Sequence, residues 1–60
     1  MIEELDNVEL TEDFEYLKKG TKGTVVYMGG RKDMCMVEFF SEGKTISVKV
    51  VKVEKLKKVS

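Results

Sequence analysis

Few side chains in this sequence can act as nucleophiles, general bases or metal ligands. The chain has no histidine and a single cysteine, Cys35, which excludes an internal disulfide and a Cys/His zinc site. A catalytic thiol needs a neighbouring base and an accessible, electropositive site. Cys35 instead shares one face of an alternating run with Val37 and Phe39. We therefore predict a buried, unreactive thiol.

Three clustered acids, Glu12, Asp13 and Glu15, are the remaining candidates for hydrolysis or for a hard cation. A calcium loop supplies about six to eight oxygen ligands from a fixed pattern such as Asp-x-Asp-x-Asp-Gly, which this chain lacks. A chain of 60 residues also leaves little room for a substrate pocket beside its core. We expect a solvated acidic loop, no enzymatic activity and no bound metal or cofactor.

Lysines accompany two glycines, Gly20 and Gly23, in the run Leu-Lys-Lys-Gly-Thr-Lys-Gly-Thr-Val-Val of residues 17–26. A P-loop has a longer glycine-rich loop and a following helix, whereas a β-prone run follows here, so we reject a phosphate cradle. Nucleic-acid binding remains an alternative, because basic residues recur near the two predicted turns. The candidates are Lys18, Lys19, Lys22, Arg31 and Lys32. The net charge of zero counts against it, since nucleic-acid-binding domains are usually strongly basic.

Aromatic side chains beside charges are typical of protein interfaces. Phe14 and Tyr16 stand among the acids of residues 11–17, and Arg31 and Phe40 complete a candidate protein-binding set. Alternatively, Phe14 or Tyr16 plugs one end of the domain. The sequence does not decide which of the two is exposed.

The zero net charge hides a marked asymmetry along the chain. Residues 1–16 hold seven acids and no base, whereas residues 17–60 hold eleven bases and four acids, a net charge of +7. Such a split can mark an interaction surface. We favour the simpler interpretation, in which the acidic arm packs near the basic face and the two fields partly cancel.

The first residues, Met-Ile-Glu-Glu-Leu-Asp, are acidic, unlike a signal peptide. No apolar run approaches the roughly 20 residues that cross a bilayer. We expect a soluble, cytoplasmic protein without a membrane partner, and a lone thiol fits that reducing compartment. The core of so short a chain is small, so we expect a monomer or a weak homodimer.

Short alternating runs between glycine-bearing turns predict five strands in one domain of 60 residues. Residues 1–7 are predicted to be a frayed lead-in. The first four predicted strands span residues 7–10, 24–28, 34–40 and 44–50. The fifth is a short strand through residue 56, and it follows a 3₁₀ turn near residues 52–54. Residues 11–19 are too short for a stable helix, so we predict an ordered loop that returns Leu17 to the core. Gly23 is expected to hold a positive φ in a tight turn.

Five short strands favour a small all-β barrel, because closure removes exposed edges. In residues 44–50, Ile46, Val48 and Val50 alternate with polar side chains, which predicts that their face is buried. Val25 and Tyr27 are expected to share a face of their strand. The side chains predicted to fill the barrel are Tyr27, Val37, Phe39, Ile46 and Val48.

Several of these residues follow a known order: Val8-Glu-Leu10, Asp13, Leu17-x-x-Gly20-x-x-Gly23-Thr-Val-Val26, Val37-Glu-Phe39 and Gly43. From about residue 8 to 59, the chain resembles a family of short bacterial proteins catalogued as domain of unknown function 4926. The resemblance implies an SH3-like barrel and brings no catalytic residues. The chain departs from the family at residues 13–15, Asp-Phe-Glu, where members tend to carry an Asp-Leu-Pro-like step. Its glycine spacing is also similar to the KOW motif of ribosomal and transcription-factor barrels.

The sequence thus predicts a five-stranded SH3-like barrel that serves as a small non-catalytic protein-interaction module. Its expected role is that of an accessory or antitoxin-like partner of another bacterial protein. A KOW-like nucleic-acid-binding barrel is the alternative.

Overall fold

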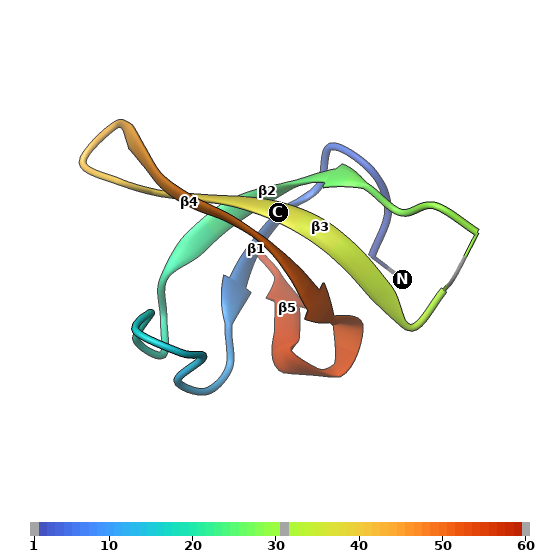
Figure 1. Ribbon diagram of the computed structural model, residues 1–60, viewed down its shortest axis with the longest axis horizontal. Helices are drawn as coiled ribbons and strands as arrows, with labels where there is room; N and C mark the ends of the chain where they lie inside the picture. The colour runs from blue at the N-terminus through green and yellow to red at the C-terminus, as the bar shows by residue number, and fades with distance from the viewer. Residues whose placement is uncertain (1, 31, 60) are drawn as a thin grey trace.

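The structure is a computed structural model that describes residues 2–30 and 32–59. It contains five strands and one 3₁₀ turn, η1 (Val53–Lys55), near its C-terminal end (Figure 1). The strands are β1 (Asn7–Leu10), β2 (Lys22–Tyr27), β3 (Met34–Ser41), β4 (Lys44–Lys52) and β5 (Leu56–Lys58). The predicted all-β class, the strand count and the 3₁₀ turn are confirmed. Within the described residues, no helix is long and apolar enough to cross a membrane.

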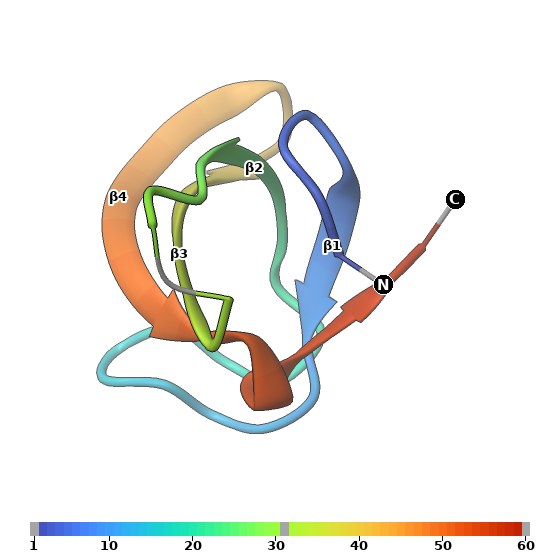
Figure 2. The same ribbon diagram turned by 90° about the vertical axis from the view of Figure 1, so that its right-hand side faces the viewer.

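All five strands form one antiparallel sheet in the order β4-β3-β2-β1-β5, which curls around a common axis (Figure 2). The first strand therefore pairs with the last, and β4 and β5 form the two edges. These edges are not paired with each other in the part of the chain that is described, so the sheet is not closed into the predicted barrel. β5 has only three residues, and its register with β1 uses all of them.

The core lies on the inner face of this curled sheet. Its buried side chains come from every strand and from the first loop: Val8, Leu10, Leu17, Val25, Cys35, Val37, Phe39, Val51 and Leu56. Val37 and Phe39 were predicted there, and both are fully buried. Cys35 is 3% exposed, as expected for an inert thiol, and this burial raises the pKa of its thiol.

The first loop is ordered and contains no helix, as predicted. Phe14 and Leu17 exchange two main-chain hydrogen bonds of 2.8 Å, which close a tight turn with Glu15 at a φ of +55°. The main-chain N–H of Lys19 donates to Asp13 Oδ1 at 2.7 Å. These bonds return the buried Leu17 to the core.

A bulge in β4 shifts its register against β3. Near the hairpin turn Phe40 is paired with Thr45, but the next pair is Phe39 with Ser47, which leaves Ile46 unpaired. Without the extra residue, Ile46 would lie opposite Phe39 and face the core. Because side chains alternate between faces, a shift of one residue exchanges the two faces of everything that follows.

The prediction that Ile46, Val48 and Val50 are buried is therefore wrong. They point outward and are 46%, 51% and 53% exposed, respectively. The inner face of β4 instead carries the half-buried Lys49 and the buried Val51. The alternation was read correctly, but the bulge reverses which face meets the core.

A second irregularity acts in the same way on β2. Val25 is paired with Val37, whereas Tyr27 is paired with Met36, so the register shifts at Val26. Val25 stays fully buried, while Tyr27 turns outward and is 58% exposed. The prediction that Tyr27 shares a face with Val25 and fills the core is wrong for this reason.

Gly23 lies inside β2 and does not adopt a positive φ, contrary to the prediction. The strand begins before it, at Lys22, and of these two glycines it is Gly20 that holds a positive φ, +91°. Gly23 has another role, because a Cβ atom there would lie 2.7 Å from both the Glu38 carbonyl oxygen and Val37 Cγ1. Only glycine lets β2 and β3 approach this closely.

Candidate functional site

The two bulges leave apolar side chains on the convex side of β2, β3 and β4. We call this surface the outer apolar face; it comprises Tyr27, Met34, Met36, Phe40, Ile46, Val48 and Val50. The side chains from β2 and β4 are exposed, and those from the central strand β3 are half-buried. A contiguous apolar patch on a small domain is characteristic of a binding surface.

Cross-strand pairing organises this face into rows. Tyr27, Met36 and Val50 form one row across three strands. In the next row, Glu38 lies between Thr24 and Val48, and one of its carboxylate oxygens accepts a hydrogen bond from the Thr45 hydroxyl. The row of Tyr27, Met36 and Val50 therefore has a fixed polar group beside it.

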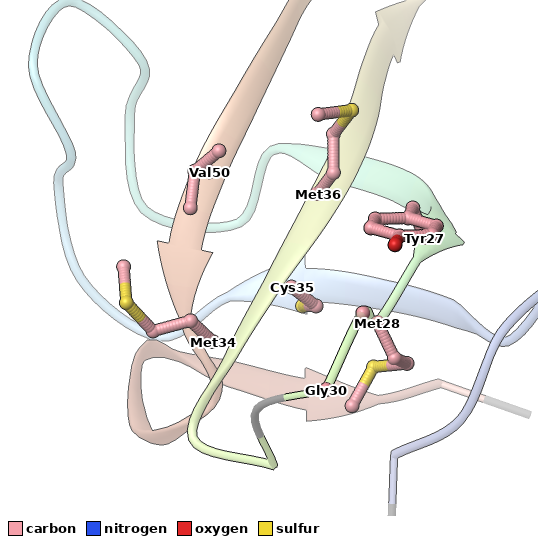
Figure 3. A pocket seen from close by; sticks show the side chains of 8 residues that line it. Tyr27, Met28, Gly30, Met34, Cys35, Met36 and Val50 are labelled. Atoms are coloured by element: carbon pink, nitrogen blue, oxygen red, sulfur yellow. The ribbon is translucent and has the colours of Figure 1, made fainter.

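An open groove of about 260 Å³ lies at one end of the outer apolar face. Its lining residues are Tyr27, Met28, Gly29, Gly30, Met34, Cys35, Met36 and Val50. In Figure 3, Tyr27 and Met36 lie side by side, Val50 lies on the neighbouring strand β4, and Met34 lies at the start of β3, where Cys35 points to the inner side. Methionine side chains are flexible and polarizable, so such a groove can adapt to an apolar side chain of a partner.

The described residues hold no group of three or more histidine, cysteine or acidic side chains that could bind a metal ion. The clustered acids of the first loop are used within the protein: Asp13 accepts from the Lys19 amide, and Glu12 and Glu15 pair with lysines. The chemistry that this arrangement supports is apolar contact rather than coordination.

The predicted protein-binding residues are not brought together. Phe14 is half-buried and packs against the core, whereas Tyr16 is 64% exposed at the tip of the first loop. Phe40 belongs to the outer apolar face, and Arg31 lies outside the described residues. Tyr16 belongs with the inner face, because its ring lies 5.4 Å from the ammonium nitrogen of Lys49. The sheet therefore separates it from Phe40.

The predicted nucleic-acid-binding residues are also divided. Lys18, Lys19 and Lys22 lie at the start of β2, whereas Lys32 follows its other end. A strand of six residues spans roughly 20 Å, so one phosphate group cannot bridge the two ends. Arg31 again lies outside the described residues.

Within residues 2–30 and 32–59, four ion pairs join the acidic N-terminal part to the basic C-terminal part. The Nζ–carboxylate distances are 3.0 Å for Lys49–Glu15, 2.7 Å for Lys55–Glu12, 3.8 Å for Lys57–Glu9 and 3.6 Å for Lys58–Asp6. The hydrogen bonds that Lys49 and Lys55 donate to Glu15 and Glu12, respectively, raise the pKa values of these two lysines. The acidic N-terminal part therefore lies beside the basic C-terminal part, as expected, and engages Lys49, Lys55, Lys57 and Lys58.

Comparison with known protein families gives one match. The family model described as Domain of unknown function (DUF4926) matches residues 4–58. This chain belongs to the DUF4926 family. No curated protein and no solved structure gives a match. The DUF4926 match spans all five strands, so the outer apolar face belongs to the family domain.

The sequence did signal the outer apolar face of this DUF4926 domain. β3 carries apolar side chains on both of its faces, since Met34, Met36 and Phe40 alternate with the core residues Cys35 and Phe39. A strand that is apolar on both sides needs a partner on both sides. The predicted site missed this signal because it relied on loop aromatics.

Proposed function

We propose that this protein is a small non-catalytic protein-interaction module with an SH3-like fold, and that its outer apolar face binds the partner. The strand order and the 3₁₀ turn before β5 support the SH3-like assignment, although the sheet is open. The partner is another bacterial protein in the cytoplasm, for which this chain is an accessory or antitoxin-like subunit. The reduced, buried Cys35 fits that compartment.

The observation that carries this proposal is the exposure of the row Tyr27–Met36–Val50 beside a methionine-lined groove. Fully burying one large apolar side chain contributes about 1.5–3 kcal/mol, so a few such residues can anchor an interface. Tyr27 adds a phenolic hydroxyl that can find a hydrogen-bond partner at the rim.

A second candidate function, nucleic-acid binding, draws on one observation. Lys18, Lys19 and Lys22 make no ion pair with any described residue, unlike Lys49, Lys55, Lys57 and Lys58. Three lysines give a log–log salt slope of only about −2 to −3. Weak, salt-sensitive association with RNA or DNA is therefore expected; sub-micromolar binding at about 0.15 M salt would favour this function over protein binding.

Two matched valine substitutions test the proposal. The protein is used to capture partners from a lysate of its host, the partner is purified, and its affinity is measured for three forms of the protein. We expect Val50→Lys to weaken binding at least about tenfold, because it places a charge in a desolvated contact. Val59→Lys makes the same change outside the outer apolar face and should leave the affinity unchanged. Equal effects of the two substitutions would contradict the proposal.

A further inference from the structure

One acidic side chain, Glu38, lies within the outer apolar face. It is half-buried in the middle of the central strand β3, between Met36 and Phe40 on the same side of that strand. Its cross-strand neighbours are Thr24 on β2 and Val48 on β4. None of these neighbours carries a positive charge that could neutralise the carboxylate.

Another acid of the same sheet shows how the fold pairs its charges. Glu9 on β1 is also half-buried, but its cross-strand neighbours are Lys22 and Lys57. The Glu9 carboxylate lies 3.8 Å from Lys57 Nζ. Glu38, in contrast, makes no ion pair with any described residue. Water therefore stabilises the charge of Glu38 as long as the outer apolar face is uncovered.

A hydrogen bond within the protein holds the Glu38 side chain in position. The Thr45 hydroxyl donates to one of its carboxylate oxygens. An ionised carboxylate offers about four acceptor sites, so most of them remain for donors from outside the protein. The group is therefore fixed in place and still able to accept a charged donor.

The lysines on the outer side of β2 and β4 lie at strand ends instead. Lys22 is the first residue of β2, and Lys44 and Lys52 are the first and last residues of β4. All three are exposed. Long lysine side chains keep their ammonium groups in water at the rim of an interface. A partner that covers the middle of the face therefore removes water from Glu38 but not from these lysines.

The loss of water from Glu38 determines what can bind. A buried carboxylate without a cationic partner costs several kcal/mol, which would offset the gain from burying a few apolar side chains. We propose that the partner covers the outer apolar face with a surface that is apolar except for one basic side chain, and that this side chain pairs with Glu38. The inference rests on the proposed function and adds the chemistry of the partner and a residue that determines specificity.

The strand geometry gives the position of the basic group relative to the apolar contacts. Glu38 follows Met36 by two positions along β3, a distance of roughly 7 Å. The partner's basic group therefore lies about that far from the apolar side chains that cover the row of Tyr27, Met36 and Val50. Arginine suits this position best, because its planar group can donate two parallel hydrogen bonds to a carboxylate.

Small amphiphiles test the proposal on the intact protein. The probes are octylammonium, which has a positive head group, and octanoate, which has a negative head group and a tail of similar length. Binding is measured by NMR titration of the isotope-labelled protein, and the shifted amide signals of Met36, Glu38 and Val48 locate the probe. We expect octylammonium to bind this face at least about fivefold more tightly than octanoate.

Two matched substitutions test the charge itself. Glu38→Gln preserves the shape of the side chain and an oxygen that can accept from Thr45, so the fold is retained. It should weaken octylammonium binding about fivefold and binding of the purified partner at least about tenfold. Glu54→Gln makes the same change in η1, outside the outer apolar face, and should leave both affinities unchanged.

Each other outcome overturns the inference. Equal binding of the two amphiphiles, or an unchanged affinity of the partner for Glu38→Gln, excludes a basic group at this position. In either case, a loss of partner affinity in Val50→Lys but not in Val59→Lys would still support the outer apolar face as the interaction site. If sedimentation shows a dimer that Glu38→Gln dissociates, the basic group belongs to a second copy of this chain and not to a different protein.

Discussion

The inner and outer faces of β2, β3 and β4 are both apolar, yet they differ in what covers them. On the inner face, Val25, Val37 and Phe39 are fully buried beneath β1, β5 and the first loop. On the outer face, Tyr27 and Val50 are more than half exposed, and nothing in the described chain lies over them. The inner face therefore stabilises the fold, while the outer face retains apolar surface for binding.

The difference arises from two single-residue irregularities. One at Val26 turns Tyr27 outward, and one at Ile46 turns the valines of β4 outward. A bulge changes the face of all later residues in its strand without changing the composition of that strand. These bulges therefore move apolar side chains from the core to the surface.

The largest difference in stability is expected between alanine substitutions of two neighbouring phenylalanines, one on each face. Phe39 is fully buried on the inner face, and Phe40 is half-buried on the outer face. We expect Phe39→Ala to lower the free energy of unfolding by about 3–5 kcal/mol, enough to unfold much of the protein. Phe40→Ala should cost about 1 kcal/mol, since less apolar area is lost. Urea denaturation followed by circular dichroism measures both, and equal losses would remove the distinction between the faces.

The second prediction concerns the closest approach of β2 and β3 on the inner side. Gly23→Val should destabilise the protein by about 3 kcal/mol, because overpacking forces the strands apart. The reason is the 2.7 Å contact with the Glu38 carbonyl oxygen rather than backbone strain. Gly30→Ala is the control, because a Cβ atom there meets nothing within 4 Å. Thermal melts that show equal stability for the two variants would contradict the packing described here.

A third comparison uses two adjacent valines of β4. Val51→Thr places a hydroxyl on the inner face, where Val51 is 1% exposed, and should cost about 1–3 kcal/mol. Val50→Thr places the same hydroxyl in solvent and should change the free energy of unfolding by less than about 0.5 kcal/mol. Chemical denaturation of both variants checks the register of β4, and the reverse order of effects would show that the bulge is absent.

The smallest predicted effect depends on pH and on Cys35. Burial raises the pKa of its thiol above the ordinary value of 9.0, so the folded protein holds the proton when the unfolded chain has lost it. The resulting stability is present below about pH 9 and is lost as the pH rises further. We expect the difference in Tm between the wild type and Cys35→Ala to narrow between about pH 9 and about pH 10. If the Tm of the wild type and the Tm of Cys35→Ala change in parallel with pH, the thiol is accessible to water.

Much of the fold could be predicted from local patterns in the sequence. β1 lies at Asn7–Leu10 as predicted, and turn-forming residues mark the β3–β4 hairpin, where Glu42 and Gly43 hold φ values of +54° and +80°. The positions of the bulges could not be predicted, because a bulge depends on pairing across two strands. The same limit explains the reversed face of β4 and the reassigned role of Gly23.

The candidate site was harder to predict than the fold. Phe40 lies half-buried on the outer apolar face, whereas Tyr16 lies on the opposite side of the sheet, next to Lys49. Tyr27 and Val50 were assigned to the core on composition and alternation alone. Which of two apolar faces is covered depends on the curl of the whole sheet, and a single strand does not encode that curl.

The pairing of β1 with β5 affects the order in which this protein can fold. The β3–β4 hairpin is local and closes through a two-residue turn, so it can form within about 1–10 μs. β1 is made first but gains its second neighbour only from residues 56–58. During synthesis on a ribosome, one edge of β1 therefore remains unpaired until β5 emerges. Until then, the side chains of Val8 and Leu10 are accessible to chaperones. Joining distant segments late in this way makes folding slow for so short a chain.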